Sequence, residues 1–184
     1  QNWSEKHSIK IFFAISLWLA SIPLQGQHEY STSRGVAVIS GSWAGEDFKI
    51  QGVKTDARLN YETARVVLRP LSTDISTGID SMDKRLKDLN MEDVRFEGKL
   101  NIDIVQTQDH PLQTFEVEGQ LIGQGWSWPV HGKGTLEHTY YQTYACMLSI
   151  SLHIELKNQT VLEDIPELGD ELIIQLKQSV LKNE

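Results

Sequence analysis

The chain of 184 residues contains a single cysteine, Cys146, which excludes an intrachain disulfide and a metal site built from several thiolates. Basic residues are also few, 17 against 25 acidic ones, and the net charge is −8. A field of that sign repels phosphate backbones, so we expect no nucleic-acid partner. The 5 prolines and 13 glycines are too few for a collagen-like or low-complexity chain. What remains is one soluble globular domain of ordinary size.

Familiar catalytic and metal-binding patterns are missing as well. None of the six histidines stands in an H-E-x-x-H or H-x-x-x-H spacing, and Gly-x-Ser-x-Gly does not occur. Cys146 stands at an apolar position of an alternating segment, which predicts a buried, unreactive thiol. We therefore expect no enzyme, no catalytic residue, no bound metal and no cofactor.

Residues 1–26 have the three parts of a secretory signal peptide. Lys6, His7 and Lys10 precede the apolar run 11–20, and small and polar residues follow it up to Gly26. The run is shorter than the about 20 apolar residues of a permanent membrane anchor. No cysteine stands directly after it, so we expect no lipoprotein anchor. We predict cleavage after Gly26 and a single domain, residues 27–184, that is periplasmic or secreted.

Alternation of apolar and polar residues dominates the chain after residue 28. The clearest segments are 96–104, 115–121 and 146–156, and shorter ones are 35–39, 48–52, 64–68, 130–136 and 172–176. Successive side chains of a strand point to opposite faces, so each segment has one apolar face. Short connections rich in turn residues favour antiparallel neighbours. About eight such strands form either a sandwich or a closed barrel.

Two features refine this prediction. Glycines stand at apolar positions of the strands, and a missing side chain relieves crowding where a barrel strand coils sharply: Gly98, Gly119, Gly132 and Gly134. Residues of about 81–89 break the alternation and place Met82, Leu86 and Leu89 on one helical stripe. The sequence therefore predicts an all-β antiparallel barrel of about eight strands with one short helix.

The apolar faces of such a barrel have two possible roles. They pack together as a solid core, or they leave a lumen for an apolar ligand. One isoprene unit contributes at most about 4 kcal/mol, at roughly 0.8 per carbon group. Binding costs about 4–15 kcal/mol, so a ligand needs several such units. Composition alone leaves both roles open.

Three parts of the chain resemble the YceI family. The stretch 57–78 and the helix after it are similar to the family's strand, Ser/Thr-rich turn and Arg-Asp-x-His-Leu-Lys helix start. In this sequence Asp83, Leu86 and Lys87 match that pattern, whereas Met82 and Arg85 depart from it. Residues 117–125 resemble the family's later hairpin, and 168–174 its terminal strand. The resemblance spans most of residues 30–180.

The resemblance implies an exported, lipocalin-like antiparallel barrel that holds a polyisoprenoid or similar amphiphile along its axis. The departures imply another headgroup or none, with Met82 presenting a soft apolar surface to a chain-like ligand.

We thus expect a non-enzymatic carrier of a long-chain apolar lipid such as a polyisoprenoid, a quinone tail or a fatty amide. A homodimer is compatible with this expectation. The candidate tunnel-lining residues are Val66, Leu68, Met82, Leu86, Phe96, Leu100, Ile102, Phe115, Val117, Leu148, Ile150 and Leu152. Four basic residues are candidates for a polar headgroup, although each is more simply a solvated surface charge: Arg58, Arg65, Arg69 and Lys87.

The alternative is an extracellular interaction module with a packed core and no lipid. Trp126 and Trp128 are two residues apart and so share a face of their strand, where they would form an exposed aromatic patch. Their other possible role is packing at the barrel mouth. A continuous apolar tunnel favours the carrier, whereas a filled axis with exposed tryptophans favours the module.

Overall fold

A computed structural model describes residues 29–71, 75–88, 93–102, 112–141, 143–157 and 165–183. The predicted signal segment 1–26 and Leu89 of the predicted helical stripe lie outside these ranges. Within the described ranges, no helix has the length and apolar character needed to span a bilayer.

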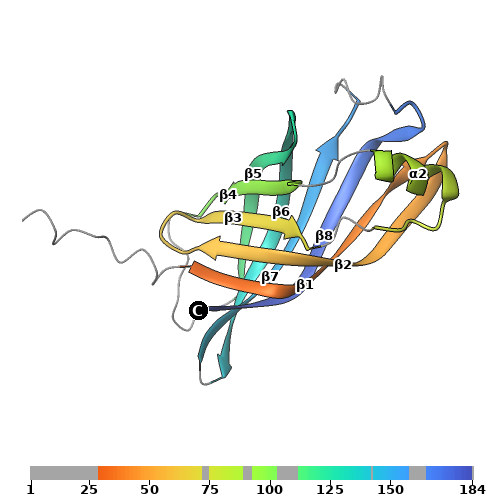
Figure 1. The fold of residues 1–184 in the computed structure, drawn as a ribbon. Coiled ribbons are helices and arrows are strands. Elements are labelled where there is room, and N and C mark those ends of the chain that lie inside the picture. Colours follow the sequence, from red (N-terminus) through yellow and green to blue (C-terminus); the bar gives the residue numbers. More distant parts are fainter. Residues whose placement is uncertain are drawn as a thin grey trace, which may run out of the picture.

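The described residues form one closed antiparallel barrel with a short helix (Figure 1). Its strands are β1 (Glu29–Trp43), β2 (Glu46–Asn60), β3 (Arg65–Pro70), β4 (Arg95–Leu100), β5 (Gln113–Gly123), β6 (Trp126–Tyr141), β7 (Thr143–Glu155) and β8 (Leu168–Asn183). Each strand pairs with the next one in sequence, and β8 closes the barrel against β1. Helix α2 (Asp80–Asp88) follows β3. The predicted eight-stranded, lipocalin-like barrel with one helix near 81–89 is confirmed.

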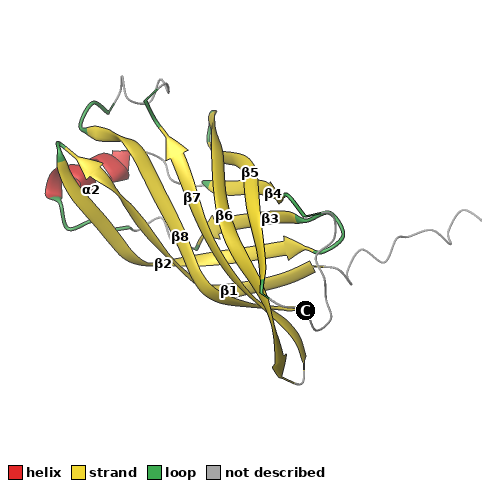
Figure 2. Ribbon diagram, turned by 180° about the vertical axis from the view of Figure 1, so that it is seen from behind, coloured by secondary structure: helices red, strands yellow, loops and turns green. Residues whose placement is uncertain are grey.

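The two ends of the barrel differ. Helix α2 lies at the end that carries the β1–β2 hairpin, which we call the helix end (Figure 2). The strand directions place the β5–β6 hairpin at the same end. The β2–β3 turn and the β6–β7 hairpin lie at the other end, which we call the distal end.

Inward-facing glycines let neighbouring strands and rings approach closely. Gly98 of β4 lies directly opposite Gly119 of β5. A Cβ atom on Gly119 would collide with the backbone of Glu97 and Gly98, and one on Gly98 would collide with the ring of Phe96. The missing side chains therefore leave interior space that aromatic rings fill, as expected for strands that coil sharply around a small barrel.

Candidate functional site

A cavity of about 480 Å³ occupies the helix end of the barrel. Strands from the whole circumference and helix α2 contribute to its wall. The apolar lining residues are Ala37, Ile39, Trp43, Phe48, Ile50, Val53, Leu68, Pro70, Ile75, Met82, Leu86, Val94, Phe96, Leu121, Trp126, Trp128, Leu152, Ile154, Ile165, Leu168, Leu172 and Ile174. A volume of about 300–1,000 Å³ with a mainly apolar wall is usual for a small-molecule site.

Polar lining residues are few, and most of them lie at the rim. Arg85 and Asp88 come from α2, Arg95 begins β4, and Gln124 is in the β5–β6 turn. Arg95 is held by Glu97, since its Nε donates to Glu97 Oε1 over 2.6 Å. The exception is Thr55, a buried residue whose hydroxyl donates to the Val53 carbonyl over 3.0 Å. The site is thus apolar inside and polar at its opening.

Helix α2 forms part of the cavity wall. Met82 and Leu86 are four residues apart, one helical turn, and both face the cavity. Met82 is only 5% exposed. The helix is fastened to the barrel by Trp43, whose Nε1 donates to Ser81 Oγ over 3.0 Å. The wall at this point therefore depends on a contact between α2 and the end of β1.

Asp83 fixes the turn that leads into the helix. Its carboxylate accepts bonds from the Thr77 amide and hydroxyl, both at 2.6 Å, and from the Ser76 hydroxyl at 2.8 Å. These bonds, those from Thr77 above all, lower the pKa of Asp83 to about 2. Asp83 is one of the residues that match the YceI pattern, and in this chain it ties the first turn of the helix to the segment before it.

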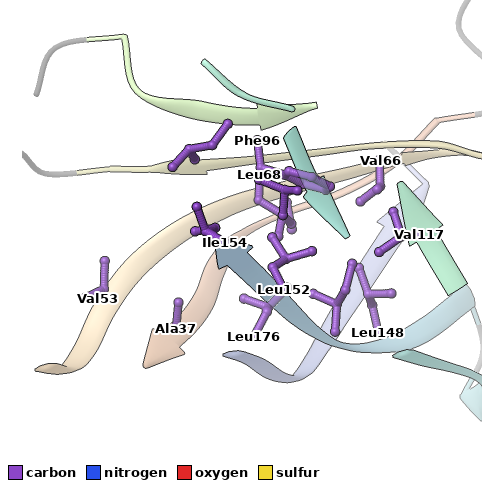
Figure 3. Close-up of a cluster of buried hydrophobic side chains, with 14 of the residues drawn as sticks. Ala37, Val53, Val66, Leu68, Phe96, Val117, Leu148, Leu152, Ile154 and Leu176 are labelled. Atoms are coloured by element: carbon purple, nitrogen blue, oxygen red, sulfur yellow. The ribbon is translucent and has the colours of Figure 1, made fainter. Parts of the chain in front are cut away.

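At the distal end of the barrel, the described side chains pack together into a core. Its fully buried side chains do not line the cavity; they include Leu59, Val66, Leu100, Leu136, Cys146, Leu148, Leu176 and Leu181. The rings of Tyr30 and Tyr61 stack there with centroids 4.0 Å apart. Burial raises the pKa of Tyr61, and it raises that of Cys146 to about 11. Figure 3 shows Leu148 and Leu176 in this cluster, and Ala37, the strand partner of Leu176, lies next to it at the border of the cavity.

The structure divides the twelve candidate tunnel residues between these two ends. Leu68, Met82, Leu86, Phe96 and Leu152 line the cavity. The others lie outside its wall: Val66, Leu100, Phe115, Val117, Leu148 and Ile150 are buried in the core, and Ile102 follows β4 and packs against the core. The inward faces are therefore divided between a cavity at one end and a packed core, a division that the sequence left open. Alternation identifies the inward face of a strand, but it does not locate a residue along the barrel axis.

Of the four candidate headgroup residues, none lines the cavity. Arg58 pairs with Asp56 at 2.9 Å and with Glu29 at 3.6 Å, and Arg69 pairs with Asp93 at 3.2 Å. Arg65 and Lys87 are exposed. Arg85 and Arg95 stand at the rim instead, and Arg85 occupies one of the two positions at which the sequence departs from the YceI pattern.

Trp126 and Trp128 stack on one another, with ring centroids 4.2 Å apart, and both line the cavity. They are half buried. The two tryptophans therefore pack at the mouth of the barrel and do not form a fully exposed aromatic patch.

Several cavity residues were missing from the sequence-based candidates, among them Ile39, Phe48, Ile50, Leu172 and Ile174. Alternation in segments 35–39, 48–52 and 172–176 placed them on strands. The pairing of β1 with β2 shifts register between Ala37 and Ile39, opposite Gly52 with its φ of 77°. Irregularities of this kind disturb the alternation and hide the full extent of the apolar face.

Within the described ranges, no three His, Cys, Asp or Glu side chains are grouped so that they could hold a metal ion.

No known family model matches this chain, and no curated protein matches it. Among solved structures, it is similar to a polyisoprenoid-binding domain from Saccharophagus degradans that is implicated in plant cell wall breakdown. The TM-score is 0.57 at 11% sequence identity, and the match covers 86% of this chain and 99% of that domain. This likeness confirms, at the level of the fold, the resemblance found in the sequence.

Proposed function

We propose that this protein is a non-enzymatic binding protein that holds the apolar chain of a lipid in the cavity at the helix end. The observation that carries the proposal is the distribution of polarity in the cavity. Apart from the buried Thr55, its deep wall consists of aliphatic and aromatic side chains, and Arg85, Asp88, Arg95 and Gln124 stand at the opening. Such a site gains free energy from hydrocarbon inside and leaves a polar head in contact with water.

The ligand class that we propose is a polyisoprenoid, a quinone tail or a fatty amide. The fold shared with a polyisoprenoid-binding domain supports this class. The two departures from the YceI pattern are also consistent with it. Met82 replaces an arginine and adds an uncharged, polarizable side chain to the wall, while Arg85 replaces a histidine at the rim.

We further propose that the protein acts after export, in the periplasm or outside the cell. The support is the basic start, short apolar run and polar end of residues 1–26. A carrier outside the cytoplasm would shield an insoluble chain from water between membranes or surfaces.

The first experiment is organic extraction of the purified full chain, followed by mass spectrometry of the extract. The delipidated protein is then titrated with farnesol, a polyprenol and oleamide, and tryptophan fluorescence is recorded. Trp43, Trp126 and Trp128 line the cavity, so a ligand that enters it changes their emission. A folded protein that carries no lipid and takes up none of the three would overturn the proposal in favour of a packed interaction module.

A matched pair of variants locates the binding site. Leu86→Gln places an amide against the bound hydrocarbon, while Lys84→Gln places the same side chain on the exposed part of the same helix. Burial of an amide without a partner costs about 1–3 kcal/mol, so we expect L86Q to bind about tenfold more weakly. K84Q should bind as the unmodified protein does. Equal affinities for the two variants would place the ligand elsewhere.

A further inference from the structure

We infer that the cavity limits the length of the lipid chain that the protein can bury. It accommodates about three isoprene units, or a single chain of about sixteen carbons, and the rest of a longer chain stays outside. This inference rests on the proposed lipid-binding function and adds a specific limit to it. It follows from the volume of the cavity, the side chains that close its inner end and the position of its polar rim.

The volume sets the amount of hydrocarbon. A water-sized group takes about 30 Å³ of liquid volume, and a methylene group is of similar size. The cavity of about 480 Å³ therefore holds about sixteen such groups. A chain of eight isoprene units has about forty carbons and is more than twice too large.

Phe96, Leu68 and Leu152 form the inner limit of the cavity. All three line it, and Leu68 lies directly opposite Phe96 in the β3–β4 pairing. The Phe96 ring extends over Gly98, the next inward position towards the distal end, where a Cβ atom would collide with the ring. Leu152 covers Gly132 in the same way, since a Cβ there would lie 3.0 Å from Leu152 Cδ2. The side chains thus fold over glycines and fill the axis.

Beyond this limit, the described core residues do not continue the cavity. Val66, Leu100 and Leu148 are at most 1% exposed and take no part in the cavity wall. Interiors of this kind are close-packed, so a chain advances into them only by displacing side chains. A ligand that enters at the helix end therefore stops at Phe96.

The wall on the other side of the cavity includes two smaller residues. Ala37 lies opposite Val53 in the β1–β2 pairing, and both line the cavity. Ala37 is 3% exposed, so a larger side chain at this position extends into the cavity rather than into water. A larger side chain at Ala37 should therefore shorten the cavity, and a smaller one at Phe96 should lengthen it.

The test compares geraniol, farnesol, geranylgeraniol and an eight-unit polyprenol for binding to the delipidated full chain. We expect affinity to rise by about tenfold or more per isoprene unit up to farnesol, since each unit buries about five carbon groups. From farnesol onward we expect a rise of less than about threefold. Affinity that continues to rise steeply up to eight units would overturn the length limit while lipid binding stands. Failure of all four alcohols to bind would instead overturn the proposed function.

Two substitutions should move this limit in opposite directions. Ala37→Leu fills the cavity by three carbons, so the plateau should fall to shorter chains and farnesol should lose about tenfold or more in affinity. Phe96→Ala removes the ring over Gly98 and should extend the plateau to geranylgeraniol. If F96A does not fold, A37L alone decides: an unchanged length preference in folded A37L contradicts the inference.

Phe115→Ala is the matched control for F96A. The Phe115 ring covers Gly134 as the Phe96 ring covers Gly98, but Phe115 belongs to the packed core and does not line the cavity. We expect F115A to be destabilised to a similar extent and to keep the farnesol plateau. A plateau that shifts equally in both variants would mean that general loosening, and not the cavity floor, sets the chain length.

Discussion

The indole Nε1 of Trp43, the last residue of β1, donates a hydrogen bond to Ser81 Oγ in helix α2 over 3.0 Å. The bond joins the rim of the barrel to the helix that completes the cavity wall. An α-helix of nine residues is marginal in isolation, so its position depends on such tertiary contacts. The integrity of the site is therefore coupled to one side-chain bond between elements far apart in the sequence.

Removal of this bond should loosen the helix. We expect Ser81→Ala to lower the unfolding free energy by about 1 kcal/mol, the net contribution of one such bond, and Trp43→Phe to lower it further because the smaller ring also loses buried packing. Protection of amides 81–88 from hydrogen exchange should fall in both variants. The double variant should cost less than the sum of the two, because both changes remove the same bond. Additive effects would show that the bond does not hold the helix.

Asp83 should make the turn before α2 sensitive to acid. Its pKa is lowered from 3.8 to about 2, so its charged form is stabilised in the folded state. The resulting stability is fully present above pH 4 and is lost as the pH falls from about 4 to about 2. We expect Asp83→Asn to be less stable than the unmodified protein at pH 6, and the difference in urea midpoint to shrink towards pH 2.

Asp80→Asn is the control for this prediction. It removes the same charge from the same helix, but the bonds from Ser76 and Thr77 go to Asp83. The urea midpoint of D80N should differ little from that of the unmodified protein between pH 6 and pH 2. A pH-independent difference for D83N would contradict the role assigned to the carboxylate.

Gly119 should not tolerate any side chain. A Cβ atom there would meet the backbone of Glu97 and Gly98, and backbone yields less readily than the end of a side chain. We expect Gly119→Ala to lower the unfolding free energy by about 1–3 kcal/mol, the usual cost of overpacking. Glu118→Ala, on the exposed face of the same strand, should change it by less than about 0.5 kcal/mol. If Gly119→Ala and the unmodified protein had equal denaturation midpoints, the close approach of β4 and β5 would be refuted.

Cys146 should be inert in the folded protein. Burial raises the pKa of its thiol to about 11, so at pH 7.5 very little thiolate is present, and the sulfur is inaccessible to reagents. We expect a chromogenic disulfide reagent to label it only after unfolding in urea. A cysteine in place of the exposed Val180, in a Cys146→Ser background, should react at once. Rapid labelling of native Cys146 would show that the distal core opens readily.

The barrel was predictable because its signals are local and repeated. Alternation in segments such as 115–121 and 146–156 requires one buried face per strand, and inward glycines such as Gly98 and Gly119 favour closure over a sandwich. The helix was predictable from the spacing of Met82 and Leu86 and from its break in the alternation. The observed start of the helix, Asp80, precedes the predicted start by one residue, and the predicted end at residue 89 lies outside the described residues.

The extent of the cavity was not predictable in this way. Phe115 and Leu121 point inward from the same strand, yet Leu121 lines the cavity and Phe115 fills the core. Likewise, nothing local distinguishes Arg85, at the rim, from Arg58, in an exposed ion pair with Asp56.

The sequence by itself thus determined which face of each strand is buried and where the helix forms, because both depend on the periodicity of neighbouring residues. The tertiary structure alone decided where the interior is hollow and which charges border the opening. Those properties arise from the register of eight paired strands and from the docking of α2, which bring together residues from distant parts of the chain.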